Sequence, residues 1–301
     1  MNFKITTLIE NNADDDNSLF NEHGLSLYIE IDEMKLLIDT GESGDFIKNA
    51  KKLKIDLNKL DYVLLSHGHY DHTGGFKSLV ENSQNSFKLI VGEKFFYNKY
   101  KLVETENYRF NGNSFNKEYI EENNIPIRYI KEDIFYINEN VMVISNFEKN
   151  NDYELLNKKF HIKKNGRYIL DDFSDEIALA IKSEKGLFVI VGCSHVGVCN
   201  ILETIIKRTG MNIYGVIGGI HLVEADDIRI EKTINYFKER DISILGMSHC
   251  TGEKAIEEIK EKLGTRYLYN NTGNIIEINH GQDKNKWWYI VGKINRAVSF
   301  K

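Results

Sequence analysis

One short stretch of the sequence, HGHYDH at residues 67–72, concentrates metal-binding side chains within six positions. It contains one carboxylate, Asp71, and the imidazoles of His67, His69 and His72. The apolar run DYVLL directly before it predicts a buried strand, so the cluster is expected where α/β folds bind ligands, at the carboxyl end of that strand. Imidazoles and a carboxylate at this spacing favour zinc, with iron or manganese as alternatives, because ligand type alone does not select the metal.

The spacing within this stretch indicates two metal positions. His67, His69 and Asp71 share one side of an extended chain, whereas His72 points to the other. One imidazole pair can therefore hold a first ion while Asp71 and His72 reach a second. The alternative is a set of hydrogen-bonded or solvated histidines, which is reasonable for any one of them but explains four clustered donors poorly.

The surrounding pattern predicts an α/β protein. Apolar runs at residues 3–10, 25–32 and 35–41 predict an antiparallel meander. Strands and helices then alternate, with a helix over residues 73–82 opened by Thr73. The second half repeats this alternation, and its first helix is expected to end at Gly210.

The predicted domain organisation is a core interrupted by one insertion. We assign residues 1–84 and 171–280 to the core. Residues 85–170, rich in asparagine, lysine and tyrosine, are predicted to form an inserted small α+β subdomain or an elaborated loop, with a helix over residues 93–102. Residues 281–301 are a C-terminal extension, in which both tryptophans suggest an extra strand or a packing arm.

Composition narrows the partners. The net charge is −6 and no basic run occurs, which argues against nucleic acid. No apolar segment is long enough to span a membrane. The N-terminal apolar run is too short for a signal peptide, and three cysteines form no CxxC pair, so we expect a cytoplasmic protein with reduced thiols.

The motifs together resemble the metallo-β-lactamase-fold superfamily, whose hallmark is the HxHxDH loop. LLIDTG at 36–41, GCSH at 192–195 and GMSHCTG at 246–252 resemble its further blocks. Within the superfamily, EHGLSLYIE, DEIALAI, GCSHVGVCNIL, GGIHL and HCTG resemble the 7,8-dihydropterin-6-methyl-4-(ribofuranosyl)aminobenzene 5′-phosphate synthase-like hydrolases. The resemblance implies a four-layer αββα sandwich and two divalent metal ions, for which zinc is preferred.

The resemblance also implies how the ligands divide between the ions. The first ion is assigned to His67, His69 and His195. The second ion is assigned to Asp71, His72 and His249. Cys193 and Cys250 flank these ligands and are alternative thiolate ligands, but the histidines already complete two sites.

His221 marks a departure from the superfamily pattern. Most members place a bridging carboxylate between the third and last ligand loops, whereas GVIGGIHLVE offers His221. A neutral imidazole cannot bridge two cations as a carboxylate does. His221 therefore binds one metal terminally or faces the substrate, with a merely structural role as the third alternative. His23, in the block EHGLS, is interpreted as a hydrogen-bonded structural histidine.

These assignments predict a metal-dependent hydrolase. A metal-bound hydroxide, oriented by Asp71, would attack a carbonyl or phosphoryl centre. Thr251 is expected to cap a following helix, and Gly252 to allow close approach of a ligand; because helix N-termini attract phosphate and carboxylate groups, we expect a small anionic substrate.

Four other functions are alternatives to a metal-dependent hydrolase. The dihydropterin-related synthase activity of the resembled subgroup is one alternative, and an idle metal-binding ligand sensor is another, although a sensor would be expected to have eroded ligands. An oxygen- or nitric-oxide-reducing di-iron protein of this fold would carry a glutamate in place of His69. A nuclease is disfavoured by the acidic composition.

Overall fold

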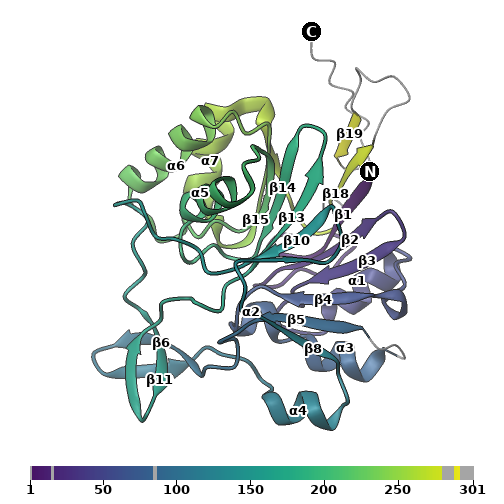
Figure 1. Ribbon diagram of the computed structural model, residues 1–301, viewed down its shortest axis with the longest axis vertical. Coiled ribbons are helices and arrows are strands. Elements are labelled where there is room, and N and C mark those ends of the chain that lie inside the picture. The colour runs from purple at the N-terminus through teal and green to yellow at the C-terminus, as the bar shows by residue number, and fades with distance from the viewer. Residues whose placement is uncertain (1, 15–16, 84–86, 280–287, 292–301) are drawn as a thin grey trace.

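Two large β-sheets pack face to face and carry helices on their outer surfaces (Figure 1). The computed structural model describes residues 2–14, 17–83, 87–279 and 288–291. Three buried apolar clusters separate four layers: one lies between the sheets and one lies under each helical layer. The predicted four-layer αββα sandwich is confirmed.

The first sheet has eight strands and contains the predicted meander. Strands β1, β2 and β3 are antiparallel, and β3, β4, β5 and β8 then run parallel to one another. In spatial order the strands are β19 (Trp288–Val291), β18 (Ile275–Asn279), β1 (Phe3–Ile9), β2 (Ser26–Ile31), β3 (Met34–Ile38), β4 (Tyr62–Leu65), β5 (Lys88–Gly92) and β8 (Ile127–Ile130). β4 is the buried strand that leads into the HGHYDH stretch.

The second sheet has seven strands, of which β14 to β17 are parallel. Its spatial order is β17 (Tyr267–Tyr269), β16 (Ile244–Met247), β15 (Ile213–Gly218), β14 (Gly186–Val191), β13 (Ala178–Ser183), β10 (Val141–Ile144) and β9 (Ile134–Tyr136). The inner parallel strands β14, β15 and β16 are almost fully buried because helices cover one face and the first sheet covers the other.

The helices divide between the two outer layers. Three helices lie against the first sheet: α1 (Asp45–Lys52), α3 (Phe76–Asn82) and α4 (Lys117–Glu122). Against the second sheet lie α5 (Val198–Thr209), α6 (Asp227–Glu239) and α7 (Glu253–Leu263). α5 ends at Gly210 with φ +68°, the left-handed conformation that glycine adopts without strain, as the sequence predicted. None of the described helices combines the length and apolarity of a membrane span.

Residues 85–170 do not form one separate insertion, because their strands belong to three different sheets. β5 and β8 belong to the first sheet, and β9 and β10 belong to the second. The remaining strands of the segment form a separate four-stranded antiparallel sheet. Its strands, in spatial order, are β12 (Arg167–Leu170), β11 (Phe160–Lys164), β6 (Lys99–Glu104) and β7 (Asn107–Phe110). Short strands of a larger sheet carry no local sign of which sheet they join.

Two local predictions were wrong. Residues 93–102 form turns and the start of β6, because pairing of β6 with β11 overrides the local helical pattern. Thr73 does not open α3: it ends the short helix α2 (Tyr70–Thr73), and its hydroxyl donates to the His69 carbonyl. α3 begins at Phe76, after Gly75. Of the predicted C-terminal extension, residues 288–291 form β19, paired with β18, and the others lie outside the described residues.

A buried ion cluster ties the four-stranded sheet to the HGHYDH loop. Lys99 Nζ, on β6, lies 2.7 Å from Asp171 Oδ2 and 2.8 Å from Asp175 Oδ1. All three side chains are buried. Asp175 Oδ2 also accepts a hydrogen bond of 2.9 Å from the backbone N–H of Gly68, between the first two histidines of the motif. The ammonium therefore fixes a carboxylate that in turn fixes the HGHYDH loop.

Replacing Lys99 by alanine is expected to lower the free energy of unfolding by about 3–5 kcal/mol, because two buried carboxylates lose their cation. Lys164→Ala, at an exposed position on the neighbouring strand β11, is the matched control and is expected to cost less than about 0.5 kcal/mol. Denaturant unfolding of both variants measures the difference. Equal stability of the two variants would contradict the role of the cluster.

Candidate metal centre

The predicted ligands converge at one edge of the two sheets, from loops that follow parallel strands. His67 and His69 follow β4, His195 follows β14, and His249 follows β16. The short helix α2 then turns Asp71 and His72 inward, so residues 70–73 are helical rather than extended. All six predicted ligands are buried and fall into two adjacent donor sets.

The first donor set consists of His67, His69 and His195. Their ring centroids are 4.7–4.9 Å apart, and His67 Nε2 lies 3.1 Å from His69 Nδ1. Both ring nitrogens of His195 are buried without a hydrogen-bond partner. Phe173 stacks on the His195 ring with 4.1 Å between ring centroids, and the Phe160 and His69 ring centroids are 5.0 Å apart. Aromatic side chains therefore form one wall of the site.

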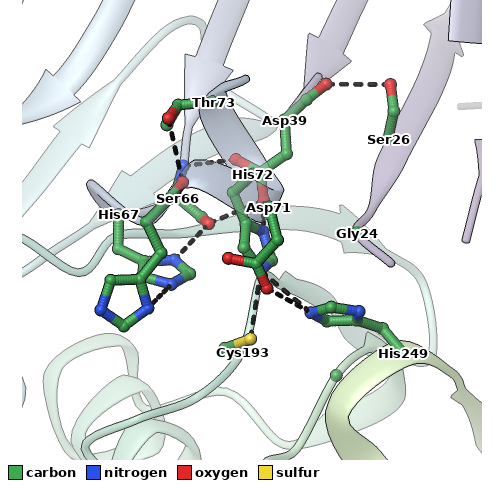
Figure 2. Close-up of polar contacts among 12 residues, drawn as sticks. Gly24, Ser26, Asp39, Ser66, His67, Asp71, His72, Thr73, Cys193 and His249 are labelled. Carbon is green, nitrogen blue, oxygen red and sulfur yellow. Dashed lines mark hydrogen bonds and ion pairs between the residues drawn. The ribbon is translucent and has the colours of Figure 1, made fainter. Parts of the chain in front are cut away.

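The second donor set contains the predicted Asp71, His72 and His249, and in addition Cys193 (Figure 2). His72 Nε2 lies 3.2 Å from His249 Nε2 and 3.1 Å from Cys193 Sγ. Asp71 Oδ2 lies 3.4 Å from His249 Nε2 and 3.8 Å from His72 Nε2. The rings of His67 and His72 have centroids 4.3 Å apart, so the two donor sets adjoin.

Three ligands are oriented by acceptors behind them. The buried Asp39 carboxylate accepts from His72 Nδ1 at 2.6 Å and from Ser66 Oγ at 2.7 Å. Because the Ser66 hydroxyl donates to Asp39, its oxygen accepts from His67 Nδ1 at 2.9 Å. Asn11 Oδ1 accepts from His249 Nδ1 at 2.8 Å. Each contact holds a proton on Nδ1, so that Nε2 of each ring is directed into the site.

Sequence reasoning missed these orienting residues. Asp39 lies within the block LLIDTG, from which only the strand before the motif was predicted. An aspartate at the end of a buried strand also indicates a paired, functional carboxylate, because aspartate is rarely buried without a partner. Asn11 lies in a loop of asparagines and aspartates, where no local pattern distinguishes it.

Charge states within the cluster agree with metal binding. Burial lowers the pKa of His67, His69 and His195 well below the usual histidine value, so these rings are neutral and able to coordinate. Burial also acts to lower the pKa of His72, but the carboxylates of Asp39 and Asp71 outweigh it and raise the pKa to about 9. A cation can therefore replace the proton on His72 Nε2 in a site that already favours positive charge.

The donor sets fit metal ions on structural grounds. Buried polar atoms in folded proteins are almost always paired, yet His69 Nε2 and both His195 nitrogens have no partner. Nitrogens of His67 and His69 lie 3.1 Å apart, and those of His72 and His249 lie 3.2 Å apart, close enough to share a proton or a metal ion. A cation at the donors would provide the partner that the unpaired nitrogens lack.

The remaining candidates lie beside these sets. His221 has φ +45°, both of its ring nitrogens are unpartnered, and its ring centroid is 4.3 Å from that of His195. It groups with Cys193 and Cys250 rather than with either predicted ligand set. His23 is half-exposed, and its Nε2 lies 3.4 Å from Asp71 Oδ2, so its ring faces the second set.

The predicted anion-binding turn differs from expectation. Thr251 is fully buried and its hydroxyl donates to the Ser248 carbonyl, so it does not cap α7. Gly252 occupies the N-cap position with φ +83°. A Cβ there would lie 2.7 Å from the Val223 Cα, so glycine is required by backbone conformation and by close packing.

Comparison with known proteins agrees with this geometry. A family model described as the metallo-beta-lactamase superfamily matches residues 21–201. The chain belongs to the metallo-β-lactamase superfamily. It is 34% identical over 291 residues to the 7,8-dihydropterin-6-methyl-4-(beta-D-ribofuranosyl)-aminobenzene-5′-phosphate synthase of Methanocaldococcus jannaschii, with 92% of this chain and 97% of that protein covered.

Solved structures of the superfamily resemble this chain as well. Tm1679, described as a metal-dependent hydrolase of the beta-lactamase superfamily, aligns with a TM-score of 0.79 and 30% identity over 91% of this chain and 98% of its own. A diphosphatase from the PhnP family aligns with a TM-score of 0.54 and 13% identity, over 92% of this chain and 97% of its own, which shows the shared fold alone.

We expect the buried histidines to make the metal-free protein acid-sensitive. Because the folded-state pKa of His195 is depressed, its contribution to stability is present above pH about 6.5 and is lost as pH falls. In chelator-treated protein, His195→Gln is therefore expected to lose less stability than wild type between pH 6.5 and 5, by up to about 1.4 kcal/mol per pH unit. Denaturant unfolding at both pH values measures this.

His161→Gln provides the control, since His161 is only partly buried on β11. Its acid response is expected to equal that of wild type. If His195→Gln shows the wild-type acid response, the neutral buried state assigned to His195 is incorrect.

Proposed function

We propose that this chain is a hydrolase that uses two divalent metal ions, with zinc preferred, on a small anionic substrate. The observation that carries the proposal is the adjacency of two buried donor sets, in which orienting contacts on Nδ1 direct the Nε2 atoms of His67, His72 and His249 into the site. His67, His69 and His195 would hold the first ion. Asp71, His72 and His249 would hold the second.

Bound divalent ions in such a pair act as Lewis acids and make water acidic enough to be a nucleophile at neutral pH. The chain supplies the remaining functions. Asp71 directs Oδ2 toward His72 and His249, and its carboxylate would accept a proton from an attacking water. Phe160 and Phe173 limit access of bulk water on the side of the first donor set. His221, with unpartnered ring nitrogens, can donate to or accept from a substrate.

Charge supports an anionic substrate. The two proposed ligand sets contain one carboxylate, Asp71, so two divalent ions would leave net positive charge. Lys101 adds a cation: it is half-buried on β6, and its Nζ lies 5.5 Å from the Phe160 ring that borders the first set. In the part of the chain that the structure describes, no carboxylate is within 4.0 Å of this ammonium.

A synthase activity of the kind named for the M. jannaschii relative is the second candidate, supported by 34% identity over nearly all of both chains. The two candidates differ in the acceptor. A hydrolase transfers the cleaved group to water, whereas a synthase joins it to a second organic substrate. Incorporation of oxygen-18 from labelled water into the product distinguishes them.

Asp71→Asn is expected to lower kcat/KM by at least about 100-fold, because the amide keeps the shape of the carboxylate but loses its charge and its basicity. The measurement pairs turnover of activated phosphoesters and carboxylic esters with metal content. We expect the first ion to be retained, since its three histidines are unchanged, and the second to be bound more weakly.

Asp152→Asn is the matched control, because Asp152 is exposed and pairs with Lys232 at the surface. It is expected to retain wild-type turnover. Full activity of Asp71→Asn over a substrate panel that wild type hydrolyses would exclude the proposed role, and absence of any bound transition metal from wild type would exclude the mechanism.

Lys101→Ala is expected to raise KM for phosphate- or carboxylate-bearing substrates about fivefold, equivalent to about 1 kcal/mol, without altering KM for neutral esters. Lys164→Ala, on the neighbouring strand, is the control. Steady-state kinetics at low ionic strength give the comparison, because salt screens such contacts. An equal change for charged and neutral substrates would show that Lys101 acts through packing.

A further inference from the structure

The sulfur of Cys193 lies within the second donor set rather than in an apolar core. Its distance to His72 Nε2 is 3.1 Å, and its Sγ falls within 4.8 Å of every other donor atom of that set. Cys199, by contrast, packs into the apolar cluster between the second sheet and its helices, whereas Cys193 belongs to none of the three apolar clusters formed by the described residues. Cys199 therefore shows how a purely structural cysteine is placed in this fold.

The geometry of the four donors matches one metal ion. Ligands placed 2.0–2.3 Å from a tetrahedral ion lie roughly 3.3–3.8 Å from one another. The separations that involve His72 Nε2 and Asp71 Oδ2 span 3.1–3.8 Å. We propose that the thiolate of Cys193 is the fourth protein ligand of the second metal ion, beside Asp71, His72 and His249. This inference rests on the metal centre of the proposed function and adds a ligand to it.

Cys250 has a different position and serves as an internal comparison. Its thiol donates to the backbone carbonyl of Cys193 at 3.6 Å, so it has an acceptor outside the second set. It groups with Cys193 and His221 and is not a member of the second set. The close approach of Gly219 supports its packing role, because a Cβ on Gly219 would lie 2.6 Å from Cys250 Sγ. Cys250 thus holds the residue 193 loop in place.

A thiolate at this position alters the charge and the metal preference of the second site. On binding, the thiol proton is released to solvent, and the sulfur gives the centre a second anionic ligand in addition to Asp71. Sulfur is a soft donor that favours zinc or cobalt over manganese and magnesium. The first set offers three imidazoles and no anionic ligand, so the two sites are expected to differ in selectivity.

Cobalt(II) titration of the metal-free protein under anaerobic conditions tests the assignment without relying on activity. Wild type is expected to bind two equivalents and to develop a near-ultraviolet sulfur-to-cobalt charge-transfer band that belongs to one of them. Cys193→Ser is expected to lose this band and to bind the second equivalent at least about tenfold more weakly. Cys250→Ser and Cys199→Ser are the matched controls and are expected to keep the band.

X-ray absorption of the zinc-loaded wild type provides a second measurement that needs no variant. A sulfur scatterer near 2.3 Å at about one half per zinc is expected when both sites are filled. Two bound cobalt ions without a charge-transfer band, or a band that survives Cys193→Ser, would overturn the thiolate assignment and leave the metal centre intact. Failure to bind any cobalt or zinc would overturn both this assignment and the proposed function.

Discussion

The buried carboxylate of Asp39 is the contact on which both donor sets depend. It accepts from the backbone and the hydroxyl of Ser66 and from His72 Nδ1, and through Ser66 it also orients His67. One carboxylate at the end of β3 therefore sets the tautomers of a ligand in each set. An unpaired carboxylate at full burial would be costly, and three short hydrogen bonds remove that cost.

Space for this arrangement exists because the two sheets approach closely at their carboxyl ends. Gly192 follows β14 in the second sheet, and a Cβ at this position would lie 2.1 Å from Ser66 Oγ in the first. A larger residue would separate His195 and Cys193 from the ligands that follow β4. The apolar cluster between the sheets holds their ends at a fixed separation, so the donors are positioned by rigid packing rather than by the loops alone.

The four-stranded sheet lies outside the sandwich and contacts the edge of the two sheets where the donor sets lie. Its β11 contributes Phe160 to the wall of the first set, and its β6 contributes Lys99 to the buried ion cluster that holds the Gly68 backbone. The same strand β6 presents Lys101 near that wall. This small sheet thus stabilises the HGHYDH loop and, under the proposed function, would form part of the surface that a substrate meets. Substrate selectivity is expected to vary with this segment while the metal ligands stay the same.

By itself, the sequence determined the elements with strong periodicity and singled out the HGHYDH stretch by its spacing. The alternating strands and helices after residue 171 were predicted correctly, because periodicity is a property of neighbouring residues, whereas the helix over residues 70–73 was not. Which short strands of residues 85–170 join which sheet was decided by long-range pairing. The roles of Asp39, Asn11 and Cys193 were likewise decided by tertiary structure, since each meets its histidine across 33, 238 and 121 residues, respectively, and no local pattern records such a contact.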